Sequence, residues 1–177
     1  MVAEFKQMTD FFREVGADNI AHTNKTYVAH AIGVYNDLRR WGAADDICHA
    51  GLFHSIYGTE IFQSFKLPLE RRGELREMIG ERAERLAYWN CMMDRSVFDS
   101  LAARREPPYL MRNRETGEEC DIGGRDYDDL CTIHLCDWLE QVPRSQKWDY
   151  RRDGYRSLAE RLGGVAREEF DRVFAGH

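Results

Sequence analysis

The stretch HAIGVYNDLRRWGAADDICHAGLFHSIYGTE, residues 30–60, decides the fold of this chain. It predicts two apolar helices joined by a short turn at Gly42, because a glycine commonly ends a helix. His30 lies on the apolar side of the first helix, and His54 lies 24 positions later on the second. Two imidazoles that face each other across a helical pair are able to hold a metal ion. The stretch therefore predicts a helical protein with a candidate metal site.

Apolar residues recur at three- and four-residue steps on both sides of this stretch, which is typical of amphipathic helices. The segment from 44 to 57 is apolar almost all round from Ile47 onward, so we expect it to be the buried central helix. The other expected helices cover residues 3–14, 18–41, 69–93 with a break at Gly80, 94–105 capped by Asp94, 126–141, 155–162 and 165–174.

The predicted class is all-α with one minor β-hairpin. That hairpin is expected over residues 109–122, where Glu115, Thr116 and Gly117 form a turn signal. The chain has 177 residues, enough to bury a sizeable core. No internal repeat or linker divides it, so we expect a single domain over residues 1–177.

Composition restricts the partners of this protein. The net charge of −6 argues against nucleic acid and against an anionic membrane, and no apolar run has the length of a membrane span. The first residues lack the basic and apolar regions of a secretory signal. Five cysteines without a CxxC pair indicate reduced thiols. We therefore expect a cytoplasmic protein.

Asp137 strengthens the case for a metal site. It lies among apolar residues in the helix CTIHLCDWLEQ, and a buried carboxylate is costly unless it is paired or bound to a metal. Two histidines and one aspartate from three helices suit a single metal ion, including the pattern found in non-haem iron enzymes. His134 lies one turn before Asp137, either as a partner of that carboxylate or as a group that contacts substrate. His22 is placed to line the mouth of a pocket whose floor is His30.

The segment AHAIGVYNDLRRWGAADDICHAGLFHS resembles the "H…G…AALLHD" pattern of the HD-domain superfamily. Its histidine spacing is closest to the small oxygenase branch, and AGLFHSIYGT also resembles an uncharacterised HD-related family of about this length. IHLCDWLEQ resembles the closing "ADxLE" helix of the superfamily. The resemblance spans residues 22–141. It implies an HD-like helical bundle in which His30, His54 and Asp137 are metal ligands.

Two positions depart from the superfamily pattern. Ser55 stands where the superfamily has an aspartate, and a serine hydroxyl is a weak, neutral ligand. The oxygenases use two further histidines between the HD pair and the last aspartate, but this chain has none from 55 to 133. The expected cofactor is therefore one equivalent of a divalent metal ion, either iron, manganese or zinc.

Three functions remain open from the sequence. The first is a metal-dependent hydrolase that acts on a phosphate ester, with an arginine binding the anion. The second is a mononuclear non-haem iron oxygenase that acts on a small polar substrate. The third is a metal-free HD-like module that binds a ligand or uses His/Asp acid–base chemistry. The residues expected to act on substrate are His22 and His134 as catalytic groups, and Ser55 with Arg71, Arg72, Arg85 or Arg95 as binding groups.

The expected ligand is a small, possibly anionic molecule, and the protein itself is compatible with a homodimer. The loop from Tyr57 to Pro68 and the hairpin over 109–122 are expected to shape the pocket.

Overall fold

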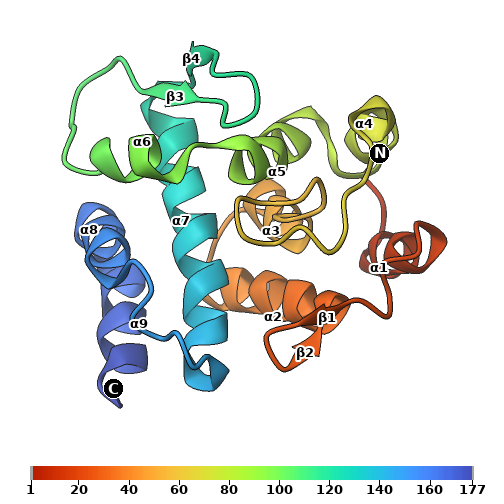
Figure 1. Cartoon of the computed structure of the whole chain (residues 1–177), viewed down its shortest axis with the longest axis horizontal. Coiled ribbons are helices and arrows are strands. Elements are labelled where there is room, and N and C mark those ends of the chain that lie inside the picture. Colours follow the sequence, from red (N-terminus) through yellow and green to blue (C-terminus); the bar gives the residue numbers. More distant parts are fainter. Residues whose placement is uncertain (1, 177) are drawn as a thin grey trace.

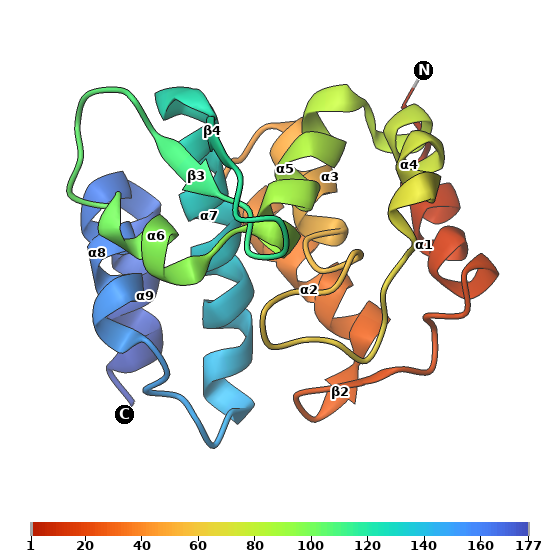
Figure 2. The same ribbon diagram turned by 45° about the horizontal axis from the view of Figure 1, so that its top comes forward.

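Helix α7 (Gly123–Gln141) runs through the middle of the molecule (Figure 1). The computed structural model describes residues 2–176. Figures 1 and 2 show α2, α3 and α5 on one side of this helix and α8 and α9 on the other, and all five pack against it. The other elements, in chain order, are α1 (Phe5–Glu14), β1 (Ala21–His22), β2 (Lys25–Thr26), α2 (Tyr27–Arg40), α3 (Asp45–Leu52), η1 (Leu69–Arg71), α4 (Arg72–Ile79), α5 (Glu81–Met92), α6 (Arg95–Ser100), β3 (Leu110–Arg112), β4 (Glu119–Asp121), η2 (Val142–Arg144), α8 (Arg152–Leu162) and α9 (Gly164–Phe174).

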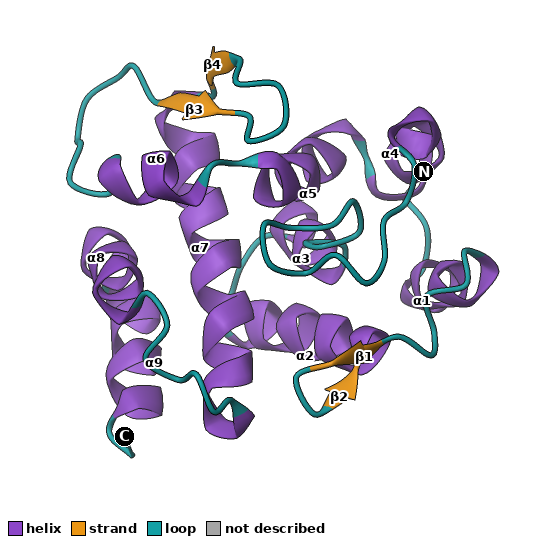
Figure 3. Cartoon of the chain, viewed as in Figure 1, coloured by secondary structure: helices purple, strands orange, loops and turns teal. Residues whose placement is uncertain are grey.

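The predicted all-α class is confirmed. Helices predominate in Figure 3, and the strands of the described residues form two small antiparallel hairpins, β1–β2 and β3–β4. The hairpin predicted over 109–122 is β3–β4, in which Met111 pairs with Cys120. The predicted break at Gly80 separates α4 from α5. Asp94 caps α6 as expected, because its carboxylate accepts hydrogen bonds from the first-turn backbone N–H groups.

The helix predicted over 18–41 is wrong in its first part. Residues 21–26 form the β1–β2 hairpin, and α2 begins only at Tyr27. Thr23 and Asn24 have positive φ angles of 36° and 61°, a conformation that a helix does not allow. The Thr26 side chain then accepts a hydrogen bond from the Ala29 backbone N–H and caps α2. The hairpin therefore precedes the first histidine of the predicted metal site.

The helix predicted over 44–57 ends early. Helix α3 stops at Leu52, and residues 53–57 form a series of turns that stay buried. His54 and Ser55 lie in these turns rather than on a helix. A turn presents consecutive side chains in different directions, so this segment does not have the one-face geometry that a helix would impose.

Helices α2 and α3 pack closely because Gly51 carries no side chain. A Cβ at this position would lie 2.2 Å from a methyl carbon of Leu38 and 3.4 Å from Val34. Leu38 and Val34 are fully buried in the α2 face that meets α3. Replacing Gly51 by alanine would therefore require the buried Leu38 side chain to move within the contact between α2 and α3.

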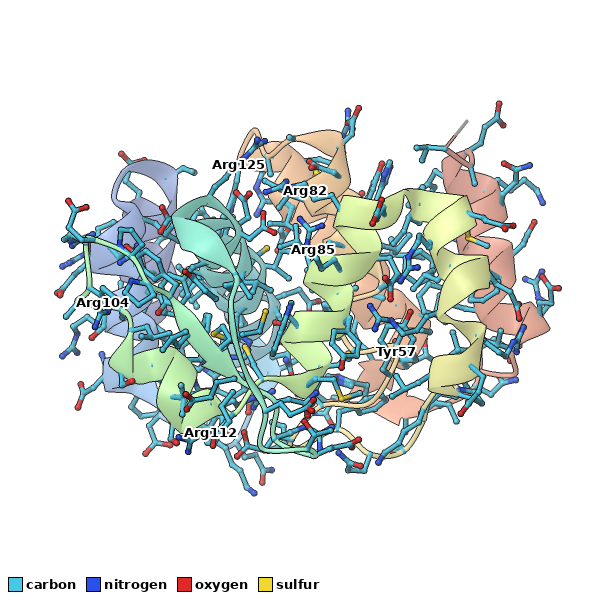
Figure 4. The ribbon with its side chains drawn as sticks, turned by 90° about the horizontal axis from the view of Figure 1, so that it is seen from above. Tyr57, Arg82, Arg85, Arg104, Arg112 and Arg125 are labelled. Carbon is cyan, nitrogen blue, oxygen red and sulfur yellow. The ribbon has the colours of Figure 1, made fainter. Side chains whose placement is uncertain are left out.

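Ion pairs of Arg82 join α5 to α3 and to α7. Arg82 of α5 contacts Asp46 of α3 at 2.5 Å and Asp126 of α7 at 2.8 Å, and it also pairs with Asp129. Figure 4 labels Arg82 and Arg85 on the side of α5 that faces α7. No helix among residues 2–176 combines the length and the apolar content that a membrane-spanning segment requires.

Candidate metal centre

Three elements bring the predicted ligands together. His30 comes from α2, His54 from the turn after α3, and Asp137 from α7. His30 Nε2 lies 3.0 Å from Asp137 Oδ1 and 3.2 Å from His54 Nε2, and His54 Nε2 lies 3.3 Å from the same carboxylate oxygen. All three residues are buried. Among the described residues they form the one group of histidine, cysteine and acidic side chains arranged closely enough to hold a metal ion.

The outer nitrogen of each imidazole is already committed to an acceptor. His54 Nδ1 lies 2.8 Å from the Gly51 carbonyl oxygen, which has no proton to donate. His30 Nδ1 lies 2.5 Å from a carboxylate oxygen of Glu140. Both Nδ1 atoms must therefore donate a proton, and the neutral form of each ring then carries a lone pair on Nε2. Two nitrogen lone pairs and a carboxylate oxygen consequently point at a common centre.

The separations of these three atoms fit a single bound metal ion. Nitrogen and oxygen ligands lie about 2.1 Å from such an ion, so two of them are about 3.0 Å apart at a right angle and about 3.4 Å apart at the tetrahedral angle. The observed separations of 3.0, 3.2 and 3.3 Å fall within that interval. Imidazole and carboxylate donors suit zinc, manganese and ferrous iron. The donor set and its geometry therefore fit the predicted cofactor.

Glu140 fixes the orientation of His30. Its carboxylate also accepts hydrogen bonds from Lys25 at 2.6 Å and from Arg144. It reaches His30 because Gly33 leaves space: a Cβ there would lie 2.7 Å from Glu140 Oε1. A carboxylate behind a ligating histidine is a common outer partner in metal sites, where it sets the tautomer and raises the basicity of the ring.

Gln141 has the equivalent role for Asp137. Its side-chain amide donates to Asp137 Oδ1 at 2.8 Å, and its side-chain oxygen accepts a hydrogen bond from the Thr23 hydroxyl at 2.8 Å. The β1–β2 hairpin therefore reaches both outer partners, Glu140 through Lys25 and Gln141 through Thr23. Because Glu140 and Gln141 follow Asp137 by three and four residues, they share its face of α7.

The protonation of this cluster follows from its hydrogen bonds. Burial alone would raise the pKa of Glu140, but hydrogen bonds from His30, Arg144 and Lys25 lower it to about 2. Burial likewise opposes ionisation of Asp137, yet the two histidines hold its pKa well below the usual range. Burial lowers the pKa of His30, but Asp137 and Glu140 outweigh it, so the net shift is upward. A proton on His30 is therefore the competitor of a metal ion.

His22 lies directly over the cluster. Its ring stacks on that of His30, with centroids 4.3 Å apart and planes 6° apart. Burial and the neighbouring His30 lower its pKa to about 4. Its Nδ1 is buried and has no hydrogen-bond partner among the described residues. The ring is thus a neutral group with an uncommitted nitrogen.

A cavity of about 200 Å³ opens next to the ligands. His54 and Asp137 form part of its wall, and His22 also lines it, but His30, which was predicted as its floor, does not. Ser55 and Arg95 also line it, so two of the predicted binding residues reach the same space. The Ser55 hydroxyl lies 3.3 Å from His54 Nε2. Part of the rim comes from the β1–β2 hairpin and the loop at 59–62.

Other predicted site residues do not reach the cavity wall. His134 lies on α7 as expected, but its Nε2 lies 3.1 Å from Arg151 Nη1 and 3.3 Å from the Tyr155 hydroxyl, and it makes no hydrogen bond to Asp137. Arg71 forms a two-point ion pair with Glu74 at the surface. Arg72 pairs with Glu84 and Arg85 with Asp126. Of the four arginines suggested as anion ligands, Arg95 is the one that lines the cavity.

The outer partners Glu140, Gln141, Thr23 and Lys25 were not predicted from the sequence. Glu140 had a detectable signal, because it belongs to the segment IHLCDWLEQ and shares a helix face with Asp137. Lys25 and Thr23 carried no such signal, because residues 18–26 had been predicted as helix.

The chain resembles one described protein family over part of its length. A family model described as a domain of unknown function (DUF6817) matches residues 11–95. The matched region contains His30, His54, Ser55 and Arg95 and ends before α7, which supplies Asp137. The search of curated proteins and the search of solved structures found no match.

Proposed function

We propose that this protein is a metal-dependent HD-like enzyme that binds one divalent ion through His30, His54 and Asp137. The observation that supports this most strongly is the convergence of three hydrogen-bond acceptors. Both Nε2 atoms and Asp137 Oδ1 lie within 3.3 Å of one another, and the hydrogen bonds to Gly51 and Glu140 fix the rings in that orientation. Such a cluster is unfavourable unless a cation or a proton occupies its centre.

The proposed reaction is hydrolysis of a phosphate ester. A bound divalent ion would supply an acidic water and polarise a phosphoryl oxygen. Glu140 and Gln141 hold His30 and Asp137 in place, so the site needs little rearrangement to act. The Ser55 hydroxyl and the uncommitted nitrogen of His22 provide hydrogen-bonding groups at the same cavity, and they are our candidates to orient the substrate or a water.

A second function is favoured by the composition of the donor set. Two histidines and one carboxylate that leave other coordination positions open are the pattern of non-haem iron oxygenases. The cavity beside His54 and Asp137 is large enough for dioxygen and a small polar substrate. The identity of the metal separates this proposal from hydrolysis.

We further propose a reducing, cytoplasmic compartment for the protein. All five cysteines are free thiols, and four of them are buried. This pattern is typical of proteins that do not rely on disulfides.

The deciding experiment is metal analysis of protein purified without chelator. We expect about one equivalent of zinc, manganese or iron per chain, lost in His54→Ala and kept in His49→Ala, a matched change at a half-buried histidine that stacks on Tyr35. If iron is found, oxygen consumption with a panel of small polar substrates tests the oxygenase, and release of phosphate from small monoesters tests the hydrolase. Failure to bind zinc, manganese or ferrous iron in direct titrations would refute the metal site.

A further inference from the structure

Arg95 is a buried cation that faces the cavity without a carboxylate partner. It is 5 % exposed; the side chain of Arg161 is equally buried, but it pairs with Asp128. Its guanidinium donates to the Tyr150 hydroxyl at 3.3 Å. No carboxylate of residues 2–176 lies within 4.0 Å of its guanidinium nitrogens; the nearby Glu60 accepts instead from the Arg95 backbone N–H.

The other arginines in sheltered positions show how unusual this is. Arg72 pairs with the fully buried Glu84, Arg82 with three aspartates, and Arg151 with Asp99. A buried charge is stable only when it is paired or well hydrogen-bonded. Every one of these comparison arginines meets that requirement within the chain. Arg95 meets it only in part, through the Tyr150 hydroxyl, and it lines the cavity.

The charges around the cavity specify the missing partner. Asp137 is the one acidic residue in the cavity wall. Ser55, which stands at the position of an aspartate in the HD pattern, is neutral. The carboxylate of Glu140 lies outside the cavity wall and pairs with two cations, Lys25 and Arg144, so it adds no negative charge to the cavity. With a divalent ion on the proposed ligands, Arg95 and the ion together leave the cavity with an excess of two positive charges. A ligand with two negative charges on one compact group would neutralise that excess.

The remaining wall indicates how such a ligand would be oriented. Ile61 is 60 % exposed and marks the rim of the cavity, whereas the adjoining Phe62 is buried in its wall. Arg95, His54 and Asp137 are all buried and lie deeper. A volume of about 200 Å³ accommodates a phosphate group with a small organic substituent and little more.

We infer that Arg95 forms an oxyanion subsite beside the metal ligands, and that the cavity takes a compact phosphate monoester with its organic group directed past Ile61. The metal-dependent part of this inference rests on the proposed function. The subsite itself rests on Arg95 and the cavity, so it can be tested in metal-free protein as well.

The test is calorimetric titration of inorganic phosphate, acetate and phenyl phosphate into metal-free and zinc-loaded protein. We expect phosphate to bind at least about 10-fold more tightly than acetate to the loaded protein, and Arg95→Gln to weaken phosphate binding at least about 10-fold. The control is Arg112→Gln, a change at an exposed arginine of β3 that pairs with Glu119. Thermal unfolding and zinc content of each variant show that fold and metal site are intact. Ile61→Ser should weaken binding of phenyl phosphate and leave inorganic phosphate unaffected.

Phosphate binding that is unchanged in Arg95→Gln would overturn the subsite, and acetate binding as tightly as phosphate would overturn the assignment to a dianion. A wild-type protein that binds no zinc, yet binds phosphate through Arg95, would refute the proposed metal function and support the subsite. Zinc binding without any phosphate binding would support the proposed metal site and refute the subsite.

Discussion

Two buried histidine clusters lie along α7, and they differ in what faces the free ring nitrogen. In the first, the Nε2 atoms of His30 and His54 face each other and the carboxylate of Asp137, all of them acceptors. In the second, Nε2 of His134 faces Arg151, which always donates, and the hydroxyl of Tyr155. Both clusters are almost fully buried, so burial does not distinguish them.

The difference teaches that the polarity of the partner decides what a buried histidine is able to do. The lone pair of His134 is satisfied by protein donors, and burial together with Arg95 and Arg151 holds the pKa of this ring well below its usual range. The first cluster leaves two lone pairs that no protein donor outside it satisfies fully. The Nε2 lone pair of His134 therefore has protein donors, although its buried Nδ1 has no hydrogen-bond partner among the described residues, whereas the first cluster gathers three acceptors that could hold a cation.

The largest difference in affinity for Zn²⁺ is expected from replacing one histidine in each cluster. His30→Gln should lower the affinity for Zn²⁺ by more than about 100-fold, because it removes a ligand and the outer contact to Glu140 together. His134→Gln should leave the affinity within about threefold of wild type. Competition titrations with a chromophoric chelator give both values. Equal losses in the two variants would break the distinction between the clusters.

Metal removal should affect the stability of the whole protein through the first cluster. A ligand at 100 times its dissociation constant stabilises a folded state by about 2.7 kcal/mol. For a chain of this size that corresponds to a rise of about 5 to 10 °C in the unfolding temperature on adding Zn²⁺. Calorimetric scans with zinc or with chelator measure it. The same shift should persist in His134→Gln and disappear in His30→Gln; a shift that survives in His30→Gln would place the ion elsewhere.

The outer partner of His30 should have a smaller effect than the ligand itself. Glu140→Gln is expected to lower the affinity for Zn²⁺ by about 10- to 100-fold, because the neutral amide no longer supports the basicity of the ring. Gly33→Ala should act in the same direction, since its Cβ would displace the Glu140 carboxylate. Glu74→Gln, a change at an exposed carboxylate paired with Arg71, serves as the control. An unchanged affinity in both test variants would show that Glu140 has no part in binding.

The smallest effect is expected at the hairpin. Lys25 is 40 % exposed, and ion pairs of this kind contribute little. Lys25→Met should lower the affinity for Zn²⁺ by about threefold or less, since Arg144 continues to pair with Glu140. The same competition titration measures it. A loss as large as that of Glu140→Gln would mean that the hairpin, and not α7, determines the orientation of the carboxylate.

Regular periodicity in the sequence was sufficient for most of the helices. The α4–α5 break at Gly80, the Asp94 cap and the β3–β4 hairpin follow from local signals that tertiary packing did not override. Residues 18–26 were misassigned because an apolar pattern was extended past Thr26, whose side chain caps α2. The end of α3 was misplaced because a buried turn and a buried helix have the same composition.

The candidate site was predictable only as far as its residues had a chemical reason to be buried. His30, His54 and Asp137 each stood out as polar groups in apolar surroundings. Which nitrogen each ring commits, and to which acceptor, depends on the packing of α7 against α2 and on the turn after α3. The contact between His30 and Glu140 joins residues 110 positions apart, so no local pattern contains it, whereas His54 and Gly51 are three positions apart and meet only because α3 ends in a turn. For the same reason, His134 and Arg71 were equal candidates until their partners were visible.

The β1–β2 hairpin and the proposed metal site are expected to stabilise each other. Thr23 and Lys25 hold the side chains of Gln141 and Glu140, and these in turn hold Asp137 and His30. If the hairpin in this position raises the affinity for the metal ion by a given factor, the bound ion must favour this position of the hairpin by the same factor. His22 and Thr23 of the same hairpin also line the cavity. Amide exchange at residues 21–26 should then report occupancy of a site that those residues do not ligate.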